Sequence, residues 1–289
     1  MVIASMPVRE HVKCSLAWFF LLPKNLIIFL LDFLKNDRSE FLGRRRFLSV
    51  TPHNITNQIV YDRHVRKCIG LHARDNVDIE VLKQIFLNHD YGLFKFKRMT
   101  ELIDLYNKIV SRGNTPLIID CGANNGMSMR YFSEVFNSSN VVGVEQYLEN
   151  YSIAQKNTLI NKNIIHNAAI GSRKSKALIK NKNSMHWAYM IEEDGGGSLD
   201  VITINDMLRV YDLNKYNPYI IKIDIEGYES NLFSENVDWI DLFPIIIIEL
   251  HDWMLPKQAN SSNFLKQISS RNRDFIFYGE NVFSISNSF

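Results

Sequence analysis

The chain has 289 residues, of which 46% are hydrophobic and 22% are charged, a composition that suits one catalytic domain with an extension. Its formal net charge of +2, without a basic stripe interleaved with aromatic residues, gives no support for a nucleic-acid partner. The three cysteines are an odd number without C-x-x-C spacing, so we expect neither a disulfide framework nor a structural zinc site, and a reducing cytoplasmic location is favoured.

Residues 1–99 carry no chemistry that can be assigned, and we expect a helical N-terminal extension to a domain that spans residues 100–289. The most apolar stretch, residues 15–31, is interrupted by a proline and a lysine, which disfavours a membrane-spanning helix or a signal peptide. A packed helix or an oligomer contact is the favoured interpretation. The alternative is peripheral membrane contact through residues 15–46, helped by the arginines at positions 44–46.

A strand, a glycine turn and a helix are predicted next along the chain. After a helix at residues 100–112, an apolar run ends in Asp120, and a second helix is expected over residues 128–136. Gly122 and Gly126 let the main chain bend and approach a ligand closely, while the N–H groups at the start of the helix favour a carboxylate or phosphate. The alternative is a tight turn whose glycines only allow close packing.

A second apolar strand ends at Glu145 and precedes a helix predicted at residues 151–161. In open α/β sheets an acid at this position accepts hydrogen bonds from ribose hydroxyls, so Glu145 is the expected ribose ligand. The dinucleotide fingerprint requires glycine where this chain has Asn124, which disfavours a pyrophosphate cofactor. S-adenosylmethionine fits better, because its sulfonium and ammonium groups are cations that the carboxylates of Asp120 and Glu145 would attract.

A third strand is predicted over residues 164–171, and its end should face an adenine ring. There Asn167 would offer a polar edge and Ala168 a small flat surface. Two short strands are expected between residues 172 and 208, joined by a loop that ends in glycines 195–197. This loop is interpreted either as a lid over the site or as a flexible surface turn.

Two more buried strands end in acidic residues. Residues 220–223 lead to Asp224 and Glu226, and four consecutive isoleucines lead to Glu249 and His251. The carboxyl ends of parallel strands share one edge of a sheet, so four strand ends would bring together Asp120, Glu145, Asp224 and Glu249. A single acid at a strand end is usually only solvated, whereas a set of four indicates a functional site.

The last predicted element is a β-hairpin within residues 274–286, made of two aromatic strands around a Gly-Glu-Asn turn. An antiparallel final strand is not typical of parallel sheets in general. A dehydrogenase would instead need a second series of β-α units, and the chain after residue 226 is too short to supply it.

Three motifs resemble those of the FkbM family of S-adenosylmethionine-dependent methyltransferases. They are D-x-G-A-N-x-G at residues 120–126, K-x-D-x-E-G-x-E at 222–229 and I-E-L-H at 248–251, and the likeness covers about the last two thirds of the chain. It implies an α/β, Rossmann-like class I methyltransferase fold with a seven-stranded, mostly parallel sheet and a C-terminal antiparallel hairpin. It also implies methyl transfer to a hydroxyl on a sugar, a glycan or a secondary metabolite. One departure is Gln146, where many relatives carry proline.

The expected site has two parts. The cofactor-binding residues are Asp120, Gly122, Ala123, Asn124, Gly126, Glu145, Asn167 and Ala168. The candidates for removing the proton from the acceptor hydroxyl are Asp224, Glu226 and His251, and a histidine that points inward has a pKa suited to this transfer at neutral pH. An alternative role for Glu226 is to cap the following helix. No metal ligands are assigned, although a divalent ion shared by Asp224 and Glu249 remains an alternative.

Two functions of other classes stay open on the sequence alone. One is an NAD-linked oxidoreductase on a Rossmann sheet, which Asn124 disfavours. The other is a non-catalytic scaffold that keeps the methyltransferase fold without turnover. The methyl acceptor would be a small molecule or a glycan, and its pocket has no recognisable sequence code.

Overall fold

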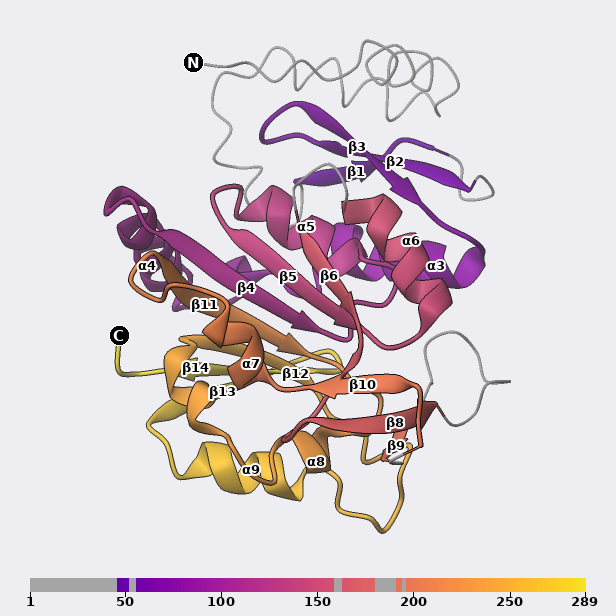
Figure 1. Cartoon of the computed structure of the whole chain (residues 1–289). Coiled ribbons are helices and arrows are strands. Elements are labelled where there is room, and N and C mark those ends of the chain that lie inside the picture. Colours follow the sequence, from indigo (N-terminus) through magenta and orange to yellow (C-terminus); the bar gives the residue numbers. More distant parts are fainter. Residues whose placement is uncertain (1–45, 52–55, 159–162, 180–190, 194–195) are drawn as a thin grey trace. The chain divides into compact units, whose positions relative to one another are not determined.

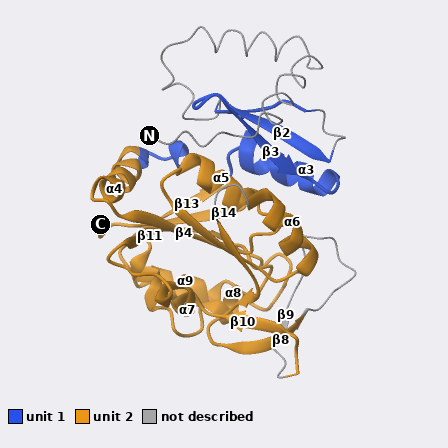
Figure 2. Cartoon of the chain, turned by 45° about the horizontal axis from the view of Figure 1, so that its top comes forward, with its two compact units in different colours: residues 1–99 blue, residues 100–289 orange. Residues whose placement is uncertain are grey.

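The computed structural model describes residues 46–51, 56–158, 163–179, 191–193 and 196–289. The chain divides into two compact units, residues 1–99 and residues 100–289 (Figure 2). The apolar stretch at residues 15–31 lies outside the described residues. Within the described parts of the chain, no helix is both long enough and apolar enough to cross a membrane.

The described part of the first unit contains a small antiparallel sheet followed by short helices. Its elements are β1 (Phe47–Ser49), β2 (Asn57–Asp62), β3 (Lys67–His72), α3 (Asn76–Leu82), the π-helix η2 (Lys83–Leu87) and the 3-10 helix η3 (Leu93–Lys95). The three strands pair in the order β1-β2-β3. This differs from the expected helical extension, because burial alternates along β3 with a period of two, and the paired Val60 and Ile69 are both fully buried.

Two residues of this unit bear on the expectations for charge and cysteines. Arg46 is buried and donates from Nη2 to Asp62 Oδ2 over 2.8 Å, so this arginine does not present its charge to a membrane surface. Cys68 is disulfide-bonded, which corrects the expectation of no disulfide framework. An odd number of cysteines still allows one bridge, so the cysteine count no longer supports a reducing compartment.

The second unit is built on a seven-stranded sheet with the order β13-β14-β12-β11-β4-β5-β6 (Figure 1). The strands are β4 (Thr115–Cys121), β5 (Asn140–Glu145), β6 (Ile164–Asn167), β11 (Tyr216–Ile223), β12 (Ile245–Glu249), β13 (Arg273–Tyr278) and β14 (Asn281–Ser286). The strands from β12 to β6 pair in parallel, whereas β14 runs antiparallel to both β12 and β13. The Rossmann-like class I sheet and its C-terminal antiparallel hairpin are therefore confirmed.

Helices cover both faces of this sheet. The helical elements are α4 (Met99–Ser111), α5 (Met127–Val135), α6 (Leu148–Thr158), α7 (Ile204–Arg209), α8 (Glu229–Leu232), the 3-10 helix η5 (Asp238–Leu242) and α9 (Ser262–Ser269). In both overall views α5 and α6 lie on one face, and α8 and α9 lie on the other (Figures 1 and 2). The isoleucines Ile245–Ile248 are all 0% exposed, as expected for a central strand covered on both faces.

A second, smaller sheet follows β6. It contains β7 (Ala169–Ile170), β8 (Ser175–Ile179), β9 (Ile191–Glu193) and β10 (Leu199–Ile202) in the order β7-β10-β8-β9. The lid interpretation falls largely outside the described residues, which omit 180–190 and 194–195. At the described end of that loop, a Cβ atom on Gly197 would lie 2.2 Å from the carbonyl oxygen of Ala177. Glycine is therefore required there by close backbone packing.

Candidate active site

The turn after β4 is held by close contacts with neighbouring backbone. Gly122 and Gly126 have φ values of 88° and 78°, and Asn124 between them has a φ of 48°. A Cβ atom on Gly122 would lie 1.7 Å from the carbonyl oxygen of Asp224, and one on Gly126 would lie 2.8 Å from Cα of Ala154. Both glycines are thus needed for packing within the protein, and Gly122 in addition lines a cavity.

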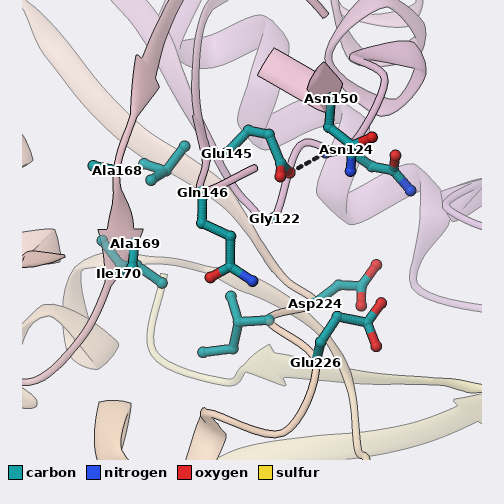
Figure 3. A pocket seen from close by; sticks show the side chains of 12 residues that line it. Gly122, Asn124, Glu145, Gln146, Asn150, Ala168, Ala169, Ile170, Asp224 and Glu226 are labelled. Carbon is teal, nitrogen blue, oxygen red and sulfur yellow. Dashed lines mark hydrogen bonds between the residues drawn. The ribbon is translucent and has the colours of Figure 1, made fainter. Parts of the chain in front are cut away.

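Glu145, at the end of β5, is fixed by main-chain donors. Its Oε2 accepts a hydrogen bond from the backbone N–H of Asn124 over 2.8 Å (Figure 3). Its Oε1 accepts one from the backbone N–H of Tyr147, also over 2.8 Å. Burial raises the pKa of this carboxyl to about 7, against the lowering effect of the two hydrogen bonds. Asn167 donates to the main-chain oxygen of Glu145 over 3.0 Å. The expected ribose ligand is therefore rigidly placed at the carboxyl end of the second strand of the sheet.

A cavity lies at the carboxyl ends of β4, β5 and β11 (Figure 3). It is lined by Gly122, Asn124, Val144, Glu145, Gln146, Asn150, Ala168, Ala169, Ile170, Asp224, Ile225 and Glu226. Three of the lining side chains are carboxyl groups, three are amides, and none is basic. The remaining wall is apolar and comes from β5, from residues 168–170 and from Ile225. Such a cavity suits a ligand that carries positive charge at one end and a flat apolar group at the other.

Only part of the expected cofactor set reaches this cavity. Gly122, Asn124, Glu145 and Ala168 line it, whereas the other four do not: Asp120, Ala123, Gly126 and Asn167. Asp120 is 0% exposed and accepts a hydrogen bond from Ser128 Oγ over 2.5 Å, so it faces the protein interior. Burial raises its pKa, although the charge of Lys222 and the bond from Ser128 oppose this. Asp120 therefore acts on the site through its protein neighbours.

Lys222 in β11 is the main residue that the sequence analysis missed. Its Nζ donates to the carbonyl oxygen of Gly122 over 2.7 Å and lies 3.2 Å from both Asp120 Oδ1 and Asp224 Oδ2, with the side chain 3% exposed. The signal was a lysine inside a run of isoleucines, since a buried cation requires anionic partners. This ammonium joins the glycine turn to the acid that follows β11.

His251 lies between four acidic side chains. Its Nδ1 is 2.8 Å from Glu229 Oε1, and Asn260 Nδ2 donates to Glu229 Oε2 over 2.5 Å. On the other side of the ring, Nε2 lies 3.6 Å from one carboxyl oxygen of each of three residues, namely Asp224, Glu226 and Glu249. The structure thus brings together the three expected catalytic residues and adds Glu249, while Glu229 and Asn260 were not foreseen.

The electrostatics of this cluster change the expected role of the imidazole. Burial alone would lower the pKa of His251, but the hydrogen bond and charge of Glu229, with the charges of Asp224 and Glu226, raise it to about 9. Burial and the charge of Asp224 raise the pKa of Glu226 to about 9 and that of Glu249 to about 7. With these shifts His251 and Glu226 would both hold a proton at neutral pH, which does not support the expectation that His251 has a pKa suited to neutral-pH transfer. Glu249, with a pKa of about 7, is the better base.

Glu226 does not cap the helix that follows it. The N-cap of α8 is Tyr228, which makes no side-chain capping hydrogen bond, and Glu226 lines the cavity instead. Its φ of 53° is unusual for a residue with a side chain and is followed by a φ of 93° at Gly227. Backbone in this region costs free energy and is found preferentially at ligand sites.

Comparisons with known proteins identify the family of this chain. The sequence matches the family described as methyltransferase FkbM domain over residues 120–277, more than half of the chain. No curated protein matches it. Matching solved structures include an O-methyltransferase from Bacillus cereus in complex with SAH (13% identity, 72% of this chain and 91% of that chain covered, TM-score 0.37). Others are a precorrin-6y C5,15-methyltransferase from Geobacter metallireducens (8%, 63% and 86%, 0.35) and cofactor-bound Rv0187 from MTB (10%, 74% and 97%, 0.38). The structural similarities are too weak to bear on activity or substrate.

Proposed function

Because the chain belongs to the FkbM methyltransferase family, we propose that it transfers the methyl group of S-adenosylmethionine to a hydroxyl oxygen of a sugar, a glycan or a secondary metabolite. The observation that carries the choice of donor is the acidic cavity, whose lining includes Glu145, Asp224 and Glu226 but no basic side chain. Burial keeps the pKa of Glu145 and Glu226 high. A cationic ligand would favour their ionised forms, and the gain in charge interaction would favour binding.

The lining residues fit the parts of this cofactor. Glu145, held by two backbone N–H groups, would accept hydrogen bonds from the ribose hydroxyls. The small apolar surface at residues 168–170 would lie against the adenine ring. Asp224 would attract the ammonium of the amino acid part, and its own position is set by Lys222. The cofactor supplies an activated methyl group on a sulfonium.

The residues near His251 would prepare the acceptor. Methyl transfer forms a bond between the acceptor oxygen and the methyl carbon and breaks the bond from that carbon to sulfur, while the hydroxyl proton passes to a base. Glu249 is the candidate base, because it is partly exposed, lies 3.6 Å from His251 Nε2 and has a pKa of about 7, whereas Glu226 would hold its proton at neutral pH. Protonated His251 would stabilise the ionised form of Glu249 until the proton arrives. Alignment of acceptor and donor supplies most of the rate.

One exposed aromatic residue favours a ring-shaped acceptor. Trp253 is 65% exposed, and its ring centroid is 6.4 Å from that of His251. An indole beside His251 offers a flat apolar face with a polar N–H, which suits the face of a sugar ring. An NAD-linked activity is disfavoured, since Asn124 gives its N–H to Glu145 and the acidic cavity would repel a pyrophosphate.

Calorimetric titration of the folded, full-length chain with S-adenosylhomocysteine tests the donor. We expect saturable heat with wild type and at least about tenfold weaker binding for Glu145→Gln, because a hydrogen bond to a charged group is lost. Glu149→Gln on the exposed face of α6 is the matched control and should bind like wild type. The proposal would be overturned if S-adenosylhomocysteine gave no heat of binding while NADH quenched the tryptophan fluorescence of the protein. Transfer of labelled methyl groups to a panel of sugars, glycans and hydroxylated metabolites then tests the acceptor.

A further inference from the structure

We propose that Asp224, Glu249 and His251 bind a divalent metal ion of the Mn²⁺ or Mg²⁺ type, and that this ion holds the acceptor hydroxyl. One potential ligand atom from each of the three residues lies within 4.8 Å of the other two. The use of the ion rests on the proposed methyl transfer, whereas its binding rests only on these side chains.

The distances within the cluster fit ligands around a shared ion better than hydrogen bonds. Nε2 of His251 is 3.6 Å from Asp224 Oδ1 and 3.6 Å from Glu249 Oε1, which is too long for an N–H···O hydrogen bond. Ligands about 2.1 Å from one ion stand roughly 3.0 to 3.4 Å from their neighbours in octahedral or tetrahedral arrangements. Small side-chain rotations would therefore close the site. Glu226 Oε2 also lies 3.6 Å from Nε2, at the edge of this site.

An independent observation is the support of the imidazole from behind. Glu229 is 0% exposed, accepts from Asn260 over 2.5 Å, and holds His251 Nδ1 at 2.8 Å. A carboxylate that fixes one ring nitrogen, so that the other points at a group of carboxylates, is the usual second layer of a histidine metal ligand. The burial of Glu229 is costly, and orienting His251 accounts for it.

The orientation of Asp224 points the same way. Its Oδ2 faces Lys222 over 3.2 Å, while its buried Oδ1, the atom nearest His251, has no hydrogen-bond partner among the described residues. Asp224 also lines the cavity, so an ion held there would be open to the acceptor. A mixed set of carboxylate oxygens and one imidazole suits Mn²⁺, and oxygen-rich sets also accept Mg²⁺.

The ion would act on the acceptor oxygen. A metal-bound hydroxyl would have a lowered pKa and give up its proton more readily to a nearby carboxylate. The charge of the ion would favour the ionised form of Glu226, which is placed to accept that proton. The rival arrangement has no metal, and protonated His251 alone balances the acids. These two arrangements differ in whether the purified chain takes up a metal in stoichiometric amount.

The test is a titration of the EDTA-treated, full-length protein with Mn²⁺, followed by the electron paramagnetic resonance signal of the free ion. We expect one site per chain in wild type, and at least about tenfold weaker binding in Glu249→Gln and in His251→Gln. Glu229→Gln keeps all three ligands and should weaken binding by about 10- to 100-fold. Asp200→Asn, an exposed acid paired with Lys176, is the control and should match wild type. Circular dichroism verifies that each variant is folded.

Two outcomes would overturn the metal site. One is the absence of stoichiometric binding by wild type up to about 1 mM Mn²⁺. The other is an equal effect of Glu249→Gln and Asp200→Asn. Calorimetry with S-adenosylhomocysteine on the same samples separates the two proposals: binding of that product without Mn²⁺ uptake removes only the metal, whereas Mn²⁺ uptake without product binding removes the methyltransferase function.

Discussion

Two charged clusters meet at Asp224, and they differ in how their charges are balanced. In the first, Lys222 lies 3.2 Å from both Asp120 and Asp224, and Lys222 and Asp120 are almost completely buried. In the second, His251 lies among Glu229, Asp224, Glu226 and Glu249, and three of these acids are about one fifth exposed. The first cluster has one cation for two acids and is mostly closed, while the second has one cation for four acids and opens to the cavity.

This difference separates a structural role from a chemical one. A buried lysine between two acids fixes the backbone, and here it joins the glycine turn after β4 to the end of β11. A cluster with unbalanced acid titrates near neutral pH or takes up a cation, which is what proton transfer and metal binding require. Variants of the two clusters should therefore lose different properties: stability in the first, ligand affinity and turnover in the second.

The largest loss of stability is expected for Lys222→Met. The variant leaves Asp120 and Asp224 without their buried cation, and breaking such a pair typically costs about 3 to 5 kcal/mol. Urea unfolding measures the change in the free energy of unfolding. Lys176→Met removes a surface pair with Asp200, with the lysine 46% exposed, and should change it by about 0.5 kcal/mol or less. Equal losses in both variants would contradict the structural role of the first cluster.

Glu145 is a buried acid whose desolvation outweighs the hydrogen bonds it accepts and the charge of Lys222, so its ionisation should weaken the fold. Burial raises its pKa from 4.5 in the unfolded chain to about 7 in the folded chain, so folded protein binds this proton more tightly. The resulting stabilisation is complete below pH 4.5 and is lost as pH rises through about 7. The shift corresponds to a free energy on the order of 3 kcal/mol.

The measurement is the difference in the free energy of unfolding between wild type and Glu145→Gln across this pH range. Other titrating groups contribute to both proteins and cancel. Wild type should lose stability relative to the variant as pH rises, and product binding to wild type should strengthen over the same range, because ribose hydroxyls donate to the ionised carboxylate. A difference that does not vary with pH would show that Glu145 titrates as an ordinary exposed acid.

The sequence predicted the framework of the site better than its contacts. Continuous apolar runs mark β4, β5, β11 and β12, so the shared edge where Glu145, Asp224 and Glu249 lie could be foreseen. The inward direction of Asp120 could not, since it depends on Ser128 and Lys222. The link between Glu229 and His251 joins residues 22 positions apart through the turn of the chain after β12, and no spacing rule announces it.

In the first unit the secondary structure itself was predicted incorrectly. Residues 1–99 contain no motif and are predicted to be helical, whereas residues 67–72 form the strand β3, whose burial has a period of two. Alternating and continuous apolar patterns can therefore be recognised in the local sequence. The partners of buried charges are set by the tertiary structure and cannot be predicted from such patterns.

Gly122→Ala tests whether the glycine turn depends on contact with β11. Gly122 and Gly113 have similar φ values of 88° and 79°, but a Cβ atom would meet the Asp224 carbonyl oxygen at 1.7 Å in the former and nothing within 4 Å in the latter. Gly113→Ala therefore measures the cost of the backbone conformation alone. We expect Gly122→Ala to lose at least about 2 kcal/mol more, by urea unfolding, and to bind S-adenosylhomocysteine poorly. Similar losses at the two positions would mean that the turn and the end of β11 can separate at little cost.

The smallest effect is expected for Trp253→Ala, which should leave both charged clusters intact. Trp253 is 65% exposed, so its removal should change the free energy of unfolding by about 0.5 kcal/mol or less. An indole that stacks on the acceptor would contribute roughly 1 kcal/mol to its binding. Removing it would increase KM about fivefold for an acceptor found in the methyl-transfer panel, with a smaller change in kcat.

Phe277→Ala, which removes an aromatic side chain that is 74% exposed on β13, is the control for general surface effects. An increase in KM that Phe277→Ala reproduces would show that the acceptor does not lie against Trp253. A KM that increases in Trp253→Ala but not in Phe277→Ala, with unchanged affinities for Mn²⁺ and S-adenosylhomocysteine, would place the acceptor beside the His251 cluster. The increase in KM would then not be caused by weaker binding of the metal or the cofactor.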